Sequence, residues 1–307
     1  MTAKTVSKRG SRRRWSVRDR EDFWTGLFCL TPAVTISLIF VVLPIIYSFY
    51  LSFHQWSILI ADKPFVGLDN YRRLLKSTEF WNAMRNTAVY TVAVVTVGSA
   101  LSLFIAVLLN RKLRFQAFYR TAYFMPVVTS TVAVAVVWTW IYNPHYGMMN
   151  YLLRLVKLPT NNWLVDPDWA LPAVIIMSIW KNIGYHMVVF LAALQQIPQA
   201  YYEAASLDGA GRLDSFRYIT WPLVKPTTSF VLVMNTIFSF RVFGPVYVMT
   251  GGGPMRRTTV IVYHIYQRAF EMREMGYASA MSWVLFAVIL AMTLLQRRFT
   301  SKGETAS

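Results

Sequence analysis

Residues 203–226 read EAASLDGAGRLDSFRYITWPLVKP, and this stretch decides the fold because it separates two long apolar runs. The stretch is polar, charged and broken by glycine, so it adds little to the stability of a membrane-spanning helix. We therefore expect it to contact something outside the membrane.

The composition indicates an integral membrane protein. The 307 residues are 55% hydrophobic and 15% charged, with a mean hydropathy of +0.39, whereas soluble domains carry about 25% charged residues. A single cysteine, Cys29, excludes a disulfide framework or a cysteine metal site within one chain.

The net charge of +17 does not predict nucleic-acid binding, because eight Lys and Arg residues lie in residues 1–20, before any apolar run. We interpret this basic arm as a topology signal beside anionic membrane lipid. No small-residue cleavage site follows the first apolar run, so we expect a retained span rather than a signal peptide.

Apolar runs of about 20 residues or more predict an all-α membrane protein with six transmembrane helices. The expected spans are 26–53, 86–110, 117–142, 169–196, 223–249 and 276–296. The predicted organisation is a basic arm at 1–25, a six-helix transmembrane domain at 26–297 with a loop at 197–222, and a tail at 298–307. Four prolines are expected inside spans: Pro32, Pro44, Pro126 and Pro245.

The distribution of Lys and Arg predicts that both termini and the polar insert are cytoplasmic. With that orientation 18 basic residues face the cytoplasm and 11 face the other side. None of the 14 carboxylates falls within an expected span. Proton- and sodium-driven carriers commonly hold such an acid near the midplane, so the energy for any pumping is expected to come from elsewhere.

Local chemistry predicts a small helix–turn–helix in the insert. Glu203 is expected to begin a helix, where a carboxylate complements the helix dipole, and Gly209 with Asp208 favours a turn. A second short helix is expected at 212–220, and Pro222 suits the first turn of the next span. The alternative is a loop that merely joins two spans.

The spacing resembles the signature loop of ABC-importer inner-membrane permeases of the carbohydrate type, the maltose and glycerol-phosphate permeases among them. That pattern is E-A-A, three residues, G, nine residues, I, any residue, L, P. Glu203, Gly209, Ile219 and Pro222 match it, and Trp221 replaces the usual Leu. The fuller carbohydrate-permease pattern is matched by Asp208, Ala210, Phe216 and Pro226.

The resemblance covers most of the chain. It includes residues 66–71, 190–198, the TGGGP sequence at 250–254, and 276–280. One departure is Gly244, where many relatives carry an acid, so a partner for Arg241 would be missing.

The resemblance implies a non-catalytic transport subunit of a bacterial or archaeal cytoplasmic membrane. The chain lacks a G-x-x-x-x-G-K-[ST] phosphate loop, and we interpret 250–254 as a flexible turn at a span end. No cofactor is expected in this chain, because ATP and Mg would be bound by a cytoplasmic ATPase dimer. The residues implied in coupling to it are Glu203, Ala204, Ala205, Asp208, Gly209, Ala210, Phe216, Arg217, Ile219 and Pro222.

The other implied partners are a second homologous permease and an extracytoplasmic solute-binding protein, which segments 54–85 and 250–275 would contact. Membrane lipid surrounds the assembly, and no nucleic acid or metal is expected. None of His54, His145 and His264 has a partner at metal-ligand spacing.

Polar and aromatic residues within the fourth and fifth spans are the substrate candidates. They are Trp180, Lys181, Asn182, Tyr185, Asn235, Ser239 and Arg241. Each has a structural alternative: the aromatic residues could pack in the core, the amides could join helices, and the cations could snorkel or cap carbonyls. His186 is interpreted as an interhelical hydrogen-bonding residue rather than a ligand.

The expected solute is a neutral sugar or glycoside, and the two unpaired cations leave glycerol 3-phosphate or a related anionic polyol phosphate as the alternative. A secondary carrier, a membrane-embedded enzyme and a channel are the competing classes. None of the three accounts for the spacing from Glu203 to Pro226.

Overall fold

The computed structural model describes residues 17–57, 59, 62–111 and 114–301, and it divides the chain into units 1–50 and 51–307. Most of the basic arm, Lys112 and the last six residues of the tail lie outside the described part. Within the described residues the regular elements are helices, with one isolated antiparallel bridge between His54 and Phe65. The all-α prediction is confirmed.

The helices are, in chain order, α1 Val17–Ser37, α2 Leu43–Ser52, α3 Asp69–Lys76, α4 Thr78–Ala93, α5 Ser99–Leu109, α6 Gln116–Val128, α7 Thr131–Ile141, α8 Met148–Leu155, α9 Ala170–Gln195, α10 Gln199–Leu207, α11 Arg212–Ser215, α12 Trp221–Phe240, α13 Gly244–Met249, α14 Ile261–Tyr266 and α15 Met275–Ser301. Four π-helical segments join neighbours: η1 Leu38–Val42, η2 Val94–Gly98, η3 Phe216–Thr220 and η4 Gln267–Glu271.

The first unit contains most of one long apolar span, Trp24–Ser52, formed by α1, η1 and α2. Pro32 lies inside α1, and the neighbouring Thr31 Oγ1 donates to the Leu27 carbonyl at 2.6 Å. Pro32 itself removes the backbone donor to the Phe28 carbonyl, a loss that membrane helices tolerate through local adjustment.

The second unit supplies the other spans: Thr78–Leu109, Ala170–Gln195, Arg212–Phe240 and Met275–Arg298. A sixth is obtained when α6 and α7 are counted together. The expected number of six is therefore reached when this bent pair is counted as one span, and two of the six expected segments are shaped differently from the prediction.

The third expected span, 117–142, is not one straight helix. α6 and α7 meet at a bend of 100°, because Thr129 and Ser130 adopt extended backbone with ψ of 146° and 131°. Pro126 lies in the last turn of α6 and removes one backbone donor there. The carbonyls left free by this break need other partners within the membrane.

The predicted end of the fifth span, 223–249, is also wrong. α12 ends at Phe240 with Arg241 as its C-cap, and a new short helix, α13, begins at Gly244. Pro245 lies in the first turn of α13 rather than inside the span, a position that suits its fixed φ.

Helix α9 is the centre of the second unit. It contributes fourteen buried residues and packs on α5, α6 and α12. Gly184 allows the closest approach, because a Cβ at this position would lie 2.0 Å from the Tyr123 carbonyl oxygen on α6. Small residues at helix crossings are a common device of membrane proteins.

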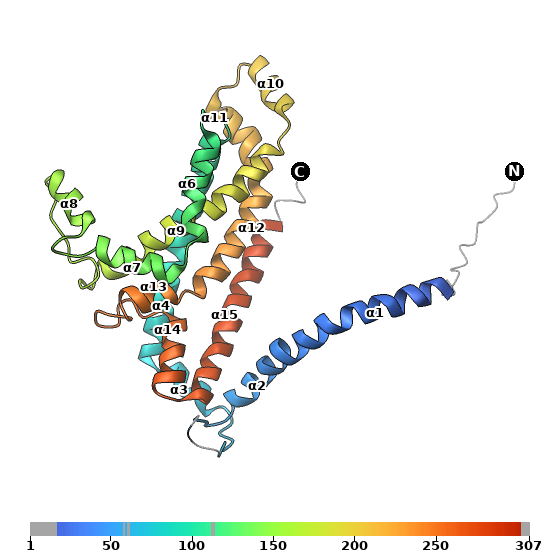
Figure 1. Cartoon of the computed structure of the whole chain (residues 1–307), viewed down its shortest axis with the longest axis vertical. Helices are drawn as coiled ribbons and strands as arrows, with labels where there is room; N and C mark the ends of the chain where they lie inside the picture. Colours follow the sequence, from blue (N-terminus) through green and yellow to red (C-terminus); the bar gives the residue numbers. More distant parts are fainter. Residues whose placement is uncertain (1–16, 58, 60–61, 112–113, 302–307) are drawn as a thin grey trace. The chain divides into compact units, whose positions relative to one another are not determined.

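The two ends of the second unit differ in character. Figure 1 shows α10 and α11 at one end, and α3 with the start of α15 at the other. Between them, α9 and α12 carry the residues singled out as substrate candidates.

We predict that Gly184→Ala destabilises the protein by about 1–3 kcal/mol, because the added methyl group overlaps the α6 backbone. Thermal unfolding of the detergent-purified protein measures this. The control is Gly98→Ala, whose Cβ would meet Ile179 Cγ1 at an ordinary 3.8 Å. Equal melting temperatures for the two variants would contradict the close approach of α6 and α9.

Candidate functional site

The loop at 197–222 begins with α10, which starts at Gln199 after Pro198. Glu203 is the fifth residue of this helix and no acid lies in its first turn. The expectation that Glu203 begins a helix and complements its dipole is therefore wrong, since Pro198 sets the helix start earlier. The Glu203 side chain is instead exposed on the body of α10.

Gly209 ends α10 through a Schellman motif. Its φ is +79°, its N–H donates to the Ser206 carbonyl, and the Ala210 N–H donates to the Ala205 carbonyl at 2.9 Å. These two bonds satisfy the last carbonyls of the helix. A Cβ on Gly209 would meet nothing within 4 Å in this chain, so the backbone conformation is what favours glycine here.

The second part of the insert is continuous with the next span. α11, η3 and α12 form one helical stretch, Arg212–Phe240. The prediction of a separate short helix at 212–220 is therefore wrong. Asp214 stabilises its start by accepting the Gly211 N–H at 3.1 Å. The hydroxyls of Tyr202 and Thr220 lie 2.9 Å apart and tie α10 to this stretch.

The loop presents an exposed surface. Two leucines are strongly exposed, Leu207 at 90% and Leu213 at 78%. Of the ten residues that the signature implicates, Glu203, Ala204, Asp208, Gly209, Arg217 and Pro222 are exposed, whereas Ala205, Ala210, Phe216 and Ile219 are half-buried. A surface that is ordered by backbone bonds and yet rich in exposed apolar groups is typical of an interaction site.

A second feature is a cavity of about 450 Å³ between α9, α12 and the bends of the third and fifth spans. This volume lies in the range of small-molecule sites. Six of the seven substrate candidates line it: Lys181, Asn182, Tyr185, Asn235, Ser239 and Arg241.

Lys181 is buried, and its Nζ donates to the carbonyls of Pro126 and Val127, each at 3.3 Å. These are carbonyls of the last turn of α6, directly before the bend. A cation at a helix C-terminus is also favoured by the helix dipole. Lys181 therefore has a structural partner as well as a position in the cavity wall.

Arg241 differs from Lys181. Among the described residues its guanidinium forms no hydrogen bond or ion pair, and its side chain is exposed in the cavity wall. Gly244, three residues on, supplies no acid. A Cβ at Gly244 would lie 3.6 Å from Thr131 Cγ2, and Thr131 lines the cavity.

One of the two amides in the cavity wall, Asn235, joins separate elements of the bundle, whereas Asn182 bonds within its own helix. Asn235 Nδ2 donates to the Val94 carbonyl and to Ser99 Oγ, and Ser239 Oγ donates to Asn235 Oδ1. Asn182 Nδ2 donates to the Ser178 carbonyl at 2.9 Å within α9. Interhelical bonds such as those of Asn235 hold membrane helices together, and each of these groups keeps at least one further hydrogen-bonding capacity.

Trp180 does not line this cavity. Its ring lies 5.4 Å from the Trp138 ring, and it borders a second, apolar cavity with Tyr123 and Pro126. His186 does lie in the cavity wall, edge-on to Tyr185 at 5.5 Å. Sequence reasoning missed Tyr90, Thr131 and Ser178, which complete the polar wall. For Ser178 the signal existed, because it precedes Lys181 and Asn182 by one helical turn.

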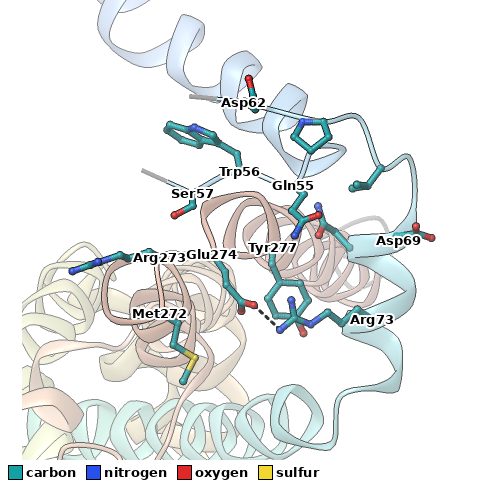
Figure 2. A pocket seen from close by; sticks show the side chains of 13 residues that line it. Gln55, Trp56, Ser57, Asp62, Asp69, Arg73, Met272, Arg273, Glu274 and Tyr277 are labelled. Carbon is teal, nitrogen blue, oxygen red and sulfur yellow. Dashed lines mark hydrogen bonds and ion pairs between the residues drawn. The ribbon is translucent and has the colours of Figure 1, made fainter. Parts of the chain in front are cut away.

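The opposite end of the unit is joined by an ion-pair network. Glu274 bonds Arg73 at 2.7 Å and Arg268 at 3.1 Å, and Glu79 pairs with both Arg268 and Arg256. Figure 2 shows the Arg73–Glu274 pair beside Tyr277. Burial opposes the Arg268 charge, but its bonds to Glu274 and Glu79 raise its pKa above the ordinary value.

This network lies beside a cavity of about 610 Å³ formed by residues 55–73 and 272–277, so the expected contact segments 54–85 and 250–275 share one end of the unit. His264 is buried close by, and its Nε2 has no partner among the described residues. Burial, with Arg268 nearby, lowers the pKa of His264 to about 4, so it is neutral near pH 7.

The TGGGP turn, which we expected to be a flexible turn at a span end, is bonded to side chains that follow it. Thr258 Oγ1 donates to the Gly253 carbonyl at 2.6 Å, and Thr259 Oγ1 donates to the Gly252 carbonyl at 3.0 Å. Asn86 on α4 donates to the carbonyls of Arg256 and Thr259. Buried threonines and an amide therefore hold the turn in one shape. Among the described residues no cluster of His, Cys, Asp or Glu could hold a metal ion.

Comparison with known proteins gives consistent results. Residues 98–302 match the family described as "Binding-protein-dependent transport system inner membrane component". The trehalose/maltose transport system permease protein MalF of Thermococcus litoralis is 36% identical over 88% of this chain and 91% of its own length. The sn-glycerol-3-phosphate transport system permease protein UgpA of Brucella abortus is 33% identical over 90% of this chain and 94% of its own length.

A solved structure is also similar. It is a bacterial ABC transporter involved in the import of the acidic polysaccharide alginate, with a TM-score of 0.83 and 26% identity over 93% of this chain and 98% of that chain. The family match covers about two thirds of the chain and includes the signature loop, the TGGGP turn and all of the cavity lining except Tyr90 and Val94. The chain therefore belongs to the inner-membrane components of binding-protein-dependent transport systems.

Proposed function

We propose that this chain forms the translocation path of an ATP-driven importer of a sugar or sugar-like solute. The observation that carries the proposal is the exposed, internally bonded loop from Glu203 to Pro222, which has the permease signature spacing. A loop that merely joined two spans would not need a Schellman motif, an Asp214 cap and a Tyr202–Thr220 bond to hold its surface in shape.

The energy source is a separate ATPase dimer, which binds ATP and Mg, because this chain lacks a phosphate loop. α10 docks on that ATPase with its exposed face, including Glu203 and Leu207. Because Arg212–Phe240 is one helical stretch, a push on the loop reaches the cavity wall at Arg241 as a rigid-body movement. The chain itself is a non-catalytic subunit.

The assembly contains a second homologous permease and an extracytoplasmic solute-binding protein. Both termini and the loop at 197–222 face the cytoplasm, and the end that carries the ion-pair network faces outward. The exposed tip of the TGGGP turn at Met255, 86% accessible, contacts the binding protein together with segment 54–85.

The solute passes through the 450 Å³ cavity, where Tyr185 packs on it and Asn182, Asn235, Ser239 and Arg241 bind its polar groups. The trehalose/maltose permease relative supports a sugar. Arg241 supports a second candidate, a glycerol phosphate, and the UgpA relative is named for that solute.

We predict that Glu203→Lys lowers ATP-dependent uptake at least tenfold while the chain still inserts, because charge reversal disrupts docking of α10. Uptake into proteoliposomes and co-purification of the ATPase measure this. The matched control is Glu271→Lys, a charge reversal at the opposite end, which leaves ATPase co-purification unchanged. Normal uptake and co-purification in the Glu203 variant would refute the coupling role.

Gly209→Asn tests whether the loop at 197–222 is a docking surface or only a connection between two spans. Asn tolerates the positive φ of this turn, and its side chain enters space that is empty in this chain. If the ATPase approaches closely, we expect uptake to fall several-fold while the melting temperature changes little. Unchanged uptake would support the simple connection.

Met255→Glu is predicted to weaken stimulation of ATP hydrolysis by the solute-loaded binding protein several-fold, because it places a charge in an apolar contact. Basal ATP hydrolysis, measured on the same proteoliposomes, should not change. Full stimulation by the loaded binding protein would place its contact elsewhere on the chain.

A further inference from the structure

The charge of the cavity is unusual for a site that would hold only neutral sugar. Its lining, all within the described part of the chain, contains Lys181 and Arg241 but neither Asp nor Glu. Ionisable residues at membrane depth are costly and usually have a functional partner. The two cations therefore need to be accounted for separately.

Lys181 is accounted for by the fold. Its Nζ donates to the Pro126 and Val127 carbonyls at 3.3 Å, and the C-terminal dipole of α6 offsets part of its charge. Replacing it would leave carbonyls at the bend unsatisfied, so the position is occupied for structural reasons.

Arg241 is not accounted for by the fold. No ion pair or hydrogen bond of its guanidinium is formed within the described residues, and Gly244 gives no carboxylate one turn further on. When the cavity is closed to water during transport, an unpaired guanidinium would lose its hydration without compensation. A neutral sugar can accept hydrogen bonds from Arg241 but cannot neutralise it.

We propose that the solute carries an anionic group, a carboxylate or a phosphate, and that Arg241 binds it through paired hydrogen bonds. This inference rests on the proposed function. Guanidinium matches the planar or tetrahedral oxygens of these groups, and such charge-assisted pairs are about twice as strong as neutral ones. The polar wall around it, which includes Asn182, Asn235 and Ser239, binds hydroxyls of the same solute.

The experiment uses the full transporter, purified through a tag on this chain and reconstituted with its binding protein in liposomes. Uptake is measured for trehalose, for a mannuronate disaccharide and for glycerol 3-phosphate. We expect uptake of one of the two acids. Uptake of the mannuronate would identify the anionic group as a carboxylate, and uptake of glycerol 3-phosphate would identify it as a phosphate. Uptake of trehalose alone overturns the inference.

The variants test Arg241 directly. Arg241→Gln should lower the uptake efficiency, kcat/KM, for the acid about 10- to 100-fold, whereas Arg241→Lys should stay closer to the native protein. Arg111→Gln removes a positive charge from an exposed site outside the cavity and outside both proposed contact segments, and it should have no effect. An Arg241→Gln variant that transports the acid normally overturns the inference.

Gly244 offers an independent test without removing Arg241. Gly244→Asp supplies the missing carboxylate near Thr131, where a Cβ has room, and should lower acid uptake at least tenfold, whereas the isosteric Gly244→Asn should not. Equal effects of the two overturn the inference. Basal ATP hydrolysis and ATPase co-purification report the proposed function separately, since both persist in every cavity variant even if the charge assignment fails.

Discussion

The structure depends on how the broken third span is held within the membrane. The bend between α6 and α7 leaves carbonyls that bilayer lipid cannot hydrogen-bond, and each unsatisfied group costs several kcal/mol. Lys181 from α9 supplies the missing donors to Pro126 and Val127. Gly184, one turn further along α9, allows α6 to come close enough for this contact. The same bend borders the cavity. Helix α9 therefore both supports the bend, through Lys181, and forms part of the cavity wall.

Helix α12 connects the two functional regions. From Arg212 to Phe240 the chain has 29 helical residues, or about 43 Å at 1.5 Å per residue. The stretch begins at the Asp214 cap beside α10 and ends where Arg241 enters the cavity wall. The Tyr202–Thr220 contact joins α10 to its first turns. A force on the loop is therefore carried along one helix to the group that we assign to the solute, without passing through flexible linkers.

The sequence predicted the class, the number of spans and the insert, because these depend on long apolar runs and on fixed residue spacing. It missed the breaks at Thr129–Ser130 and after Phe240. Both lie in apolar sequence, where Pro126 and Pro245 are compatible with an intact membrane helix and only tertiary partners decide. The grouping of Trp180 with Lys181, Asn182 and Tyr185 ignored the helical period: residues 178, 181, 182 and 185 share one face, whereas Trp180 turns toward Trp138. The hydrogen bonds that follow the TGGGP turn were only partly foreseeable, since Thr258 and Thr259 lie close to it in sequence, whereas Asn86, which bonds the Arg256 and Thr259 carbonyls, lies 164 residues before Thr250.

The roles of Lys181 and Arg241 could not be separated from sequence, because both are single cations in apolar runs. The separation is geometric. Lys181 lies opposite a helix C-terminus that can use its charge, whereas Arg241 is itself the C-cap of α12 and reaches into the cavity. At the end of the unit opposite α10, by contrast, Arg73, Arg256 and Arg268 share Glu79 and Glu274. Within its described residues the chain therefore pairs the basic residues of that network with carboxylates and leaves Arg241 without one, in the cavity that we propose to hold the solute. The negative charge is then expected from the cargo.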